Sequence, residues 1–297
     1  MSALELHAPR LIAMATPKHA ARCTWEEAVE ILRSDPAHQE RIYDSYLTAD
    51  LLGNCERFFR GAEFREVASM VQSHCVHARR ILDMPGGNGI ATYAFARSGF
   101  DVTTVEPDPS DTVGHGAIAR VLAGRGVRAD VVAAVGEKLP FRAASFDVVY
   151  VRQGLHHARD LLGMTMEIAR VLRPSGVLLA CREHVVDNYR GSLEAFLESQ
   201  PDHQLYGGEH AFTLKDYRGA IVSAGLRMAL ELGPFDSIVN MFPNDHATLR
   251  RRILLTTPGR VLGLLLSADR VATIGMGLLR RRRTPGRLYS FIARKGE

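Results

Sequence analysis

The chain has 297 residues, of which 46% are hydrophobic and 24% are charged, and its net charge is +4. This composition suits one large hydrophobic core with additions and excludes a globally disordered chain. So small a net charge also argues against a broad electrostatic surface for RNA or DNA, and no nucleic-acid partner is expected. The four cysteines form no C-x-x-C pair, and the first thirty residues lack the apolar run of a signal peptide, which together predict reduced thiols in the cytoplasm.

Residues 1–77 form an N-terminal extension with helical spacing of apolar residues, for example at 25–32 and 57–71. A break between helices is predicted at Gly53 and Asn54. Two interpretations remain open. The extension either closes over a ligand as a lid, or covers an apolar face. That face would belong to the sheet or to a partner subunit, and in the second case the protein would be a homodimer.

Residues 80–106 have the pattern of a strand, a glycine-rich turn, a helix and a second strand that ends at Glu106. The turn contains Gly86, Gly87 and Gly89, which lack the Cβ that would keep the backbone away from a ligand. In a parallel sheet, an acidic residue at the tip of the second strand can bind ribose hydroxyls. These residues therefore predict half of a nucleotide-binding site.

The details of the turn separate two classes of nucleotide. A dinucleotide site needs G-x-G-x-x-G, but Thr92 stands at the last glycine position. Asp83, at the end of the first strand, would repel a pyrophosphate, whereas it would attract an ammonium group. S-adenosylmethionine carries an ammonium group and two ribose hydroxyls, which match Asp83 and Glu106. The stretch DMPGGNG at 83–89 resembles the D-x-G-x-G-x-G motif of the class I S-adenosylmethionine-dependent methyltransferases, with Pro85 in place of the first glycine. NAD-dependent oxidoreduction is therefore disfavoured.

Further motifs extend the resemblance over residues 78–235 and a terminal strand at 288–294, and the alternation of strands and helices predicts a doubly wound sheet. The later strands are expected at 131–133, 146–151 and 177–180, with a helix at 164–172. The resemblance implies an α/β fold with a Rossmann-like, doubly wound sheet of seven strands, an N-terminal helical extension and a helical insertion before the last strand. The corresponding boundaries are 1–77 for the extension, 78–242 for the core, 243–285 for the insertion and 286–297 for the last strand.

The resemblance implies that S-adenosyl-L-methionine is the cofactor. Asp83 would hold its methionine amino group, and Glu106 would hold its ribose. Val135 replaces the aspartate that binds the adenine amino group in many relatives, so adenine would be bound by backbone groups in the following turn. The predicted cofactor set comprises Asp83, Gly86, Gly87, Gly89, Glu106, Pro107, Gly136, Glu137, Arg152 and Gln153, the last two at the methionine end.

The acceptor is expected to bind near residues 181–188, which follow the predicted fifth strand. Because the carboxyl ends of parallel strands face the ligand crevice, Glu183 and His184 are expected beside the acceptor. Histidine is the usual base near neutral pH, and His184 is the preferred candidate. The catalytic candidates are His184, Glu183, His156 and His210.

The other two histidines have weaker support. The adjacent His156 and His157 are more typical of packing than of catalysis. His210 lies in a loop at 206–213, before a helix at 214–224 whose predicted N-cap is Thr213. A histidine-carboxylate group could hold a metal, but no H-x-x-x-H spacing supports it, so no metal is predicted.

The insertion is strongly basic between Arg250 and Arg283. Residues 261–279 are apolar enough to suggest a membrane helix, but Asp269 and Arg270 at their centre disfavour spanning. Three interpretations remain: a helical hairpin packed on the core or on a dimer partner, an interfacial helix whose arginines contact anionic lipid headgroups, and a basic patch for an acidic acceptor.

The predicted function is transfer of a methyl group from S-adenosylmethionine to oxygen, nitrogen or carbon of a small-molecule acceptor. The alternative is a catalytically weak or inactive protein of the same fold that acts as a binding or scaffold module through the hairpin at 250–283. No motif in the acceptor-side loops identifies the acceptor or the methylated atom.

Overall fold

The computed structural model of the chain describes residues 23–297. The first 22 residues of the predicted extension lie outside the described residues. They include most of the first thirty residues, on which the signal-peptide prediction was based. The sheet has eight strands: seven follow the order β3-β2-β1-β4-β5-β8-β7, and the short β6 pairs with β5. The strands are β1 (Arg80–Asp83), β2 (Asp101–Val105), β3 (Asp130–Val132), β4 (Phe146–Arg152), β5 (Leu172–Val186), β6 (Phe212–Thr213), β7 (Leu226–Leu232) and β8 (Arg287–Lys295).

The sheet is parallel except for β8, which pairs antiparallel with both β5 and β7. This order and direction confirm the predicted doubly wound α/β fold with a last, antiparallel strand. In β4, residues 148–151 are all buried, as expected for a central strand that is covered on both faces.

The fifth strand is longer than predicted. β5 continues to Val186, so Glu183 and His184 lie within the strand and not in a loop after it. The cause is the antiparallel partner, because β8 pairs Tyr289 with Glu183 and Leu288 with His184, beyond an irregularity that follows Ala180. The prediction of a short strand that ends before these residues is therefore wrong.

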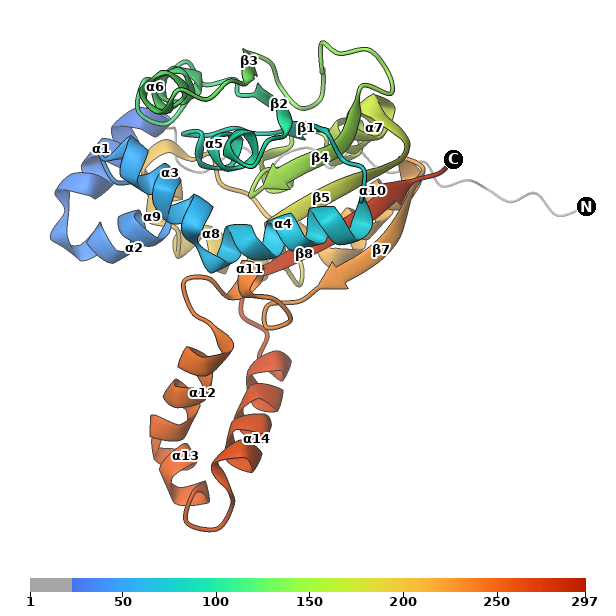
Figure 1. Cartoon of the computed structure of the whole chain (residues 1–297). Coiled ribbons are helices and arrows are strands. Elements are labelled where there is room, and N and C mark those ends of the chain that lie inside the picture. The colour runs from blue at the N-terminus through green and yellow to red at the C-terminus, as the bar shows by residue number, and fades with distance from the viewer. Residues whose placement is uncertain (1–22) are drawn as a thin grey trace, which may run out of the picture.

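Different helices cover the two faces of the sheet (Figure 1). One apolar cluster joins Phe58, Phe64 and Phe95 to the sheet, and the other joins Ile168 and Ile221 to its opposite face. The helices are α3 (Leu51–Arg60), α4 (Ala62–His74), α5 (Ile90–Arg97) and α6 (His115–Arg125) on the first face, and α7 (Leu161–Val171) and α10 (Leu214–Ser223) on the second. The predicted N-cap of α10 is confirmed, since Thr213 and Asp216 form a capping box.

The N-terminal extension divides into two parts. Its α3 and α4 cover the sheet, whereas α1 (Trp25–Ser34) and α2 (Gln39–Asp44), joined by a 3₁₀ turn at Pro36–His38, lie near α8 (Ser192–Glu198) and α9 (Pro201–Tyr206). The predicted break at Gly53 and Asn54 is wrong. Both residues lie in the first turn of α3, where the Asp50 side chain accepts a hydrogen bond from the Gly53 N–H, and the break falls at Gly61.

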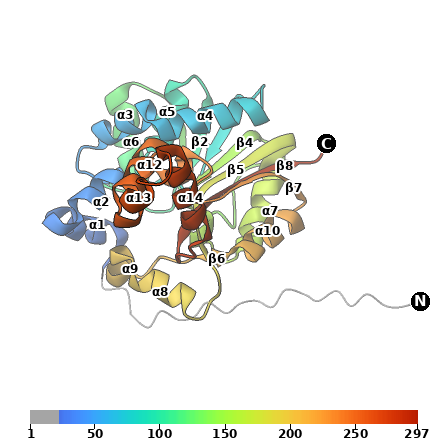
Figure 2. The same cartoon turned by 90° about the horizontal axis from the view of Figure 1, so that it is seen from below.

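The insertion forms three helices between β7 and β8: α12 (His246–Leu255), α13 (Thr257–Leu262) and α14 (Ala268–Arg281). They project away from the sheet, beyond the short α11 (Ile238–Met241) (Figure 1). Seen from below, they stand in front of the core (Figure 2). Within residues 23–297, no helix combines the length and the apolar character needed to cross a membrane. All four cysteines are described and have free thiols.

Candidate active site

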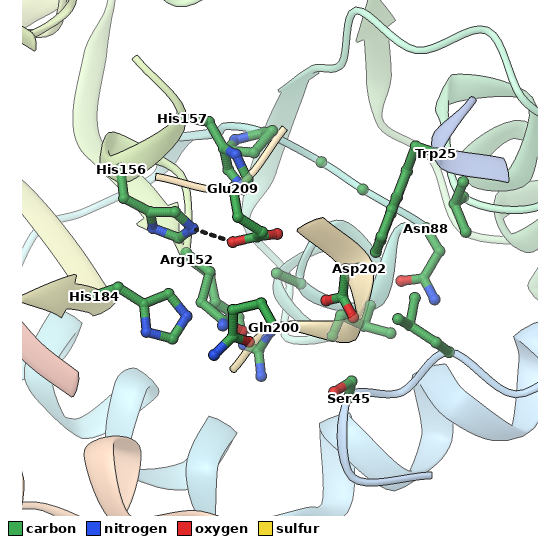
Figure 3. A pocket seen from close by; sticks show the side chains of 18 of the residues that line it. Trp25, Ser45, Asn88, Arg152, His156, His157, His184, Gln200, Asp202 and Glu209 are labelled. Carbon is green, nitrogen blue, oxygen red and sulfur yellow. Dashed lines mark hydrogen bonds and ion pairs between the residues drawn. The ribbon is translucent and has the colours of Figure 1, made fainter. Parts of the chain in front are cut away.

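A polar cavity of about 200 Å³ lies where β1 and β4 end (Figure 3). Seven residues predicted from the sequence line it: Asp83, Gly86, Gly87, Arg152, Gln153, His156 and His184. The other predicted residues lie outside this lining: Gly89, Glu106, Pro107, Gly136, Glu137, Glu183 and His210. The remaining lining residues come from the N-terminal segment, the glycine turn and its following helix, and the 200–209 segment, together with Val113 and His157.

Asp83 is a buried carboxylate with one unused oxygen at this cavity. Only 1% of the residue is exposed, and its Oδ2 accepts a hydrogen bond of 2.7 Å from the Thr92 hydroxyl. The Thr92 hydroxyl is also 2.9 Å from that of Thr104, whereas Asp83 Oδ1 has no protein partner. Burial raises the pKa of Asp83 to about 7, because the charged form is poorly solvated. A buried carboxylate with one unpaired oxygen is a suitable partner for a cationic ammonium group.

The glycine turn brings the backbone close to β2. A Cβ at Gly86 would lie 2.2 Å from Thr104 Cγ2 and 2.7 Å from Ile118 Cδ1, so a side chain does not fit there. Gly87 and Gly89 have φ angles of +53° and +89°, which favour glycine. At Gly86 and Gly87 the turn presents main chain to the cavity, whereas Pro85 and Asn88 of the same turn line it with their side chains.

Glu106 holds this turn in place. Its Oε2 accepts a hydrogen bond of 2.7 Å from the Gly87 N–H, and its Oε1 accepts one of 2.9 Å from the Asp108 N–H. Burial raises the pKa of Glu106 to about 7. Each carboxylate oxygen has a second lone pair, which can accept a hydrogen bond from a ribose hydroxyl. Pro107 is exposed next to it.

The predicted adenine turn lies outside the cavity lining. Gly136 packs against two methionines, since a Cβ there would lie 2.8 Å from Met164 Cε and 2.9 Å from Met84 Cε. Glu137 Oε1 accepts a hydrogen bond of 2.8 Å from the Arg159 N–H and thereby anchors the loop before α7. These contacts give both residues a structural role, which is independent of the predicted binding of adenine.

Glu183 is wholly buried behind the cavity. Its carboxylate accepts hydrogen bonds from the N–H groups of Gly154, Leu155 and His156, at 3.0, 3.1 and 3.0 Å. A fourth contact, of 2.8 Å, joins its Oε2 to Nδ1 of His156. Since a charged carboxylate can only accept, Nδ1 of His156 carries the proton and Nε2 is left with its lone pair. Burial lowers the pKa of His156 well below the usual value, so the ring is neutral near pH 7.

His184 has a similar arrangement. Its Nδ1 lies 2.8 Å from the Gly286 carbonyl oxygen, which requires a proton on Nδ1. Burial lowers the pKa of His184 to about 3, and its ring contacts those of His156 and Phe196, at centroid distances of 4.9 and 4.8 Å. His210 packs against Phe212 instead, with ring centroids 4.7 Å apart.

The fold brings His156, His157 and Glu209 together, a grouping that linear spacing did not reveal. Their ligand-capable atoms lie within 4.8 Å of one another, so these residues could hold a metal ion. Nε2 of His156 is 3.8 Å from Glu209 Oε2, as the dashed line in Figure 3 shows. Nδ1 of His157 is 3.1 Å from the Gly208 carbonyl oxygen. A bond from the other ring nitrogen to an oxygen is usual for metal ligands as well as for bases.

Sequence reasoning missed the wall of the cavity formed by α2 and α9. Arg41 Nη2 donates hydrogen bonds of 2.9 Å to Gln200 Oε1 and 2.7 Å to Asp202 Oδ2. Trp25 packs on Tyr206, with ring centroids 5.0 Å apart. No local motif marks these contacts, which join residues about 160 positions apart in the chain.

Arg152 connects the cavity to α4. Its Nε and Nη2 donate hydrogen bonds of 2.8 and 3.2 Å to the buried Glu63, and its Nη1 donates one of 3.0 Å to Gln153 Oε1. The guanidinium lies over the rings of Tyr46 and Phe58, 5.6 Å from each centroid. Arg152 is therefore fixed by the extension, while it also lines the cavity.

Comparison with known proteins agrees with this geometry. A methyltransferase domain model matches residues 82–180. An uncharacterized methyltransferase from Mycobacterium sp. strain JLS is 32% identical over 176 residues, which cover 57% of this chain and 66% of that protein. Residues 82–180 therefore resemble a methyltransferase domain, and the chain spans just under two thirds of the length of this relative.

Two solved structures share the fold. Phosphoethanolamine N-methyltransferase 2 from Haemonchus contortus has a TM-score of 0.55 and 17% identity, over 93% of this chain and 61% of that one. A candidate sarcosine dimethylglycine methyltransferase from Galdieria sulphuraria has a TM-score of 0.51 and 19% identity, over 78% of this chain and 84% of that one. At these identities the likeness concerns architecture alone.

Proposed function

We propose that the chain transfers a methyl group from S-adenosylmethionine to oxygen or nitrogen of a small polar molecule. The observation that carries this proposal is that Asp83, whose buried Oδ1 has no hydrogen-bond partner, lines the cavity beside two glycines that present backbone to it. Asp83 would hold the ammonium group, Gly86 and Gly87 would contact the cofactor through their main chain, and Glu106 would hold the ribose. When bound, the cofactor supplies a methyl group that its sulfonium already activates.

The polarity of the far wall supports a polar acceptor. Arg41 lines the cavity from α2. Gln200, Asp202 and Glu209 face it from the 200–209 segment (Figure 3). Asp202 Oδ1 is buried without a hydrogen-bond partner. Buried polar atoms favour ligands that complete their hydrogen bonds, because an unpaired group loses its solvation. Hydroxyl or amino groups on a small metabolite would satisfy these atoms.

His156 is the base in this proposal, and Glu183 positions it. The bond from Nδ1 to Glu183 fixes the ring, keeps Nε2 unprotonated and stabilises the imidazolium that forms. The acceptor O–H or N–H would give its proton to Nε2 as the methyl group is transferred. His184, the candidate preferred from sequence, lines the same cavity and would bind the acceptor. We further place the protein in the cytoplasm, which its four free thiols support.

The test is turnover. The purified chain is incubated with methyl-labelled S-adenosylmethionine and a fractionated metabolite extract, with the Asp83→Asn variant as control. A labelled small molecule that forms with the wild type alone is expected. Cofactor binding without any labelled product would favour the alternative, a scaffold protein that has kept the pocket.

A further inference from the structure

The insertion is a hairpin that is stabilised mainly by its own contacts. We call residues 246–281 (α12, α13 and α14) the hairpin. Arg250 Nη1 lies 2.6 Å from Asp269 Oδ1, which joins α12 to α14. The two helices also approach closely at Gly275, where a Cβ would lie 2.4 Å from Ile253 Cγ2. At its base, Arg280 forms an ion pair of 3.0 Å with Asp236. The hairpin extends well away from the sheet (Figure 1).

The tip of the hairpin exposes large apolar side chains. Leu264 and Leu265, in the connection between α13 and α14, are 84% and 82% exposed, the highest fractions among the large hydrophobic residues that the structure describes. Four more exposed apolar residues lie on its helices: Leu255, Val261, Ile274 and Leu278. Large apolar side chains gathered on one projecting element are typical of an interaction surface.

The charge of the insertion is opposite to that of the rest of the chain. Residues 243–285 contain nine arginines and two aspartates, whereas the remaining sequence has 28 basic and 31 acidic side chains. Arg260 and Arg270 flank the two leucines, and Arg251, Arg252 and 281–283 lie nearer the core, all exposed. Apolar and basic side chains are thus combined on one projecting element.

We propose that the hairpin docks on the surface of an anionic lipid bilayer. Leu264 and Leu265 enter the boundary between headgroups and acyl chains, and the arginines bind lipid phosphates. Interfacial helices combine these features, since burial of a few apolar residues is marginal until anionic lipids add their attraction. A second copy that pairs hairpin to hairpin fits less well, because it would bring another excess of positive charge to the same place.

The topology places the cavity at the same edge of the sheet as the base of the hairpin. β8 is antiparallel to both β5 and β7, so β7 runs in the same direction as β5 and ends at the same edge of the sheet. The hairpin begins after β7 and returns to the start of β8, which places its base at that edge. Asp83 and Arg152, at the ends of β1 and β4, lie at this edge as well. This docking does not depend on the methyl-transfer proposal.

The experiment is co-sedimentation of the full chain with vesicles. Vesicles of phosphatidylcholine alone are compared with vesicles that also contain about 30% phosphatidylglycerol, at low and high salt. We expect binding to the anionic vesicles that weakens with salt. The Leu264→Ser/Leu265→Ser variant should bind roughly 30- to 100-fold more weakly. The matched control is Met166→Ser/Val222→Ser, which removes two exposed apolar side chains from α7 and α10 and should bind like the wild type.

Three results would overturn the proposal. They are no sedimentation of the wild type with anionic vesicles, equal sedimentation with neutral ones, and unchanged binding of the leucine variant. Light scattering tests whether the tip instead binds a second copy of the chain. That assignment would follow if the wild type is a dimer, the leucine variant is a monomer, and neither binds vesicles. Equal melting temperatures of both variants and the wild type establish that the fold is intact.

Discussion

The two halves of the cavity are built in different ways. The cofactor half consists of one short stretch in which β1, the glycine turn and Thr92 position the Asp83 carboxylate. The acceptor half is assembled from α1, α2, β4, β5 and the 200–209 segment, and its contacts join residues up to 161 positions apart. The first half can therefore be kept while the second changes. We infer that the cofactor half fixes the reaction class and the acceptor half fixes the substrate.

The largest effect is expected in the acceptor half. His156→Ala should lower kcat by roughly 10²–10⁴-fold and leave cofactor affinity unchanged, because it removes the base but no cofactor contact. His77→Ala, which alters an exposed histidine, is the control for single-turnover measurements. A kcat within threefold of the wild type would move the base to another residue, first to His184.

A chelator sharpens the same comparison. Turnover should persist in excess chelator if His156 acts as a base. Loss of turnover that an added divalent cation restores would instead assign His156, His157 and Glu209 as metal ligands.

Asp83→Asn should separate binding from stability in the cofactor half. Loss of the ammonium partner should weaken cofactor binding by about 100-fold, measured by equilibrium dialysis. The same change should stabilise the free protein. The pKa of Asp83 is raised from 3.8 to about 7 on folding, so the folded state binds more protons, and the free energy of unfolding falls as the pH rises between these values.

At pH 8 the Asp83→Asn change removes the free-energy cost of burying a charged carboxylate, and the melting temperature should rise by roughly 2–6 °C. Calorimetric melts at pH 5 and pH 8 check the sign, since the gain should be smaller at the lower pH. A lower melting temperature at pH 8 would show that the carboxylate is paired in the free protein.

Glu106→Ala should have a smaller effect on binding. It removes the acceptor for the Gly87 N–H and for ribose hydroxyls, which should weaken cofactor affinity by about 1–3 kcal/mol. Asp101→Ala is the matched control, because Asp101 is an exposed acid at the other end of the same strand, where it pairs with Arg80. Equal affinity of the Glu106 variant and the wild type would restrict Glu106 to a structural role.

The local structure of the proposed cofactor half was predictable because its information is local. Asp83, the glycines and Glu106 lie within 24 residues, and strand and turn geometry bring them together without long-range contacts. Even there, the bond from Thr92 to Asp83 was missed, since its spacing matters only on the helix that follows the turn. Elements with strong periodicity, such as α10 and β8, were also predicted correctly.

The acceptor half was not predictable for a physical reason. Glu183 was placed in a loop because the sequence did not show that β8 would extend β5 past Ala180, and that extension buries its carboxylate behind His156. Arg41 and Asp202 carry no motif at all, because only the packing of α1 and α2 against α9 brings them together.

Titration calorimetry with S-adenosylmethionine and its demethylated product tests the central claim most directly. The account predicts saturable binding of both compounds to the wild type, with one site per chain, and much weaker binding to Asp83→Asn. Absence of binding heat with either compound, from protein whose fold is verified by a cooperative melt, would contradict it.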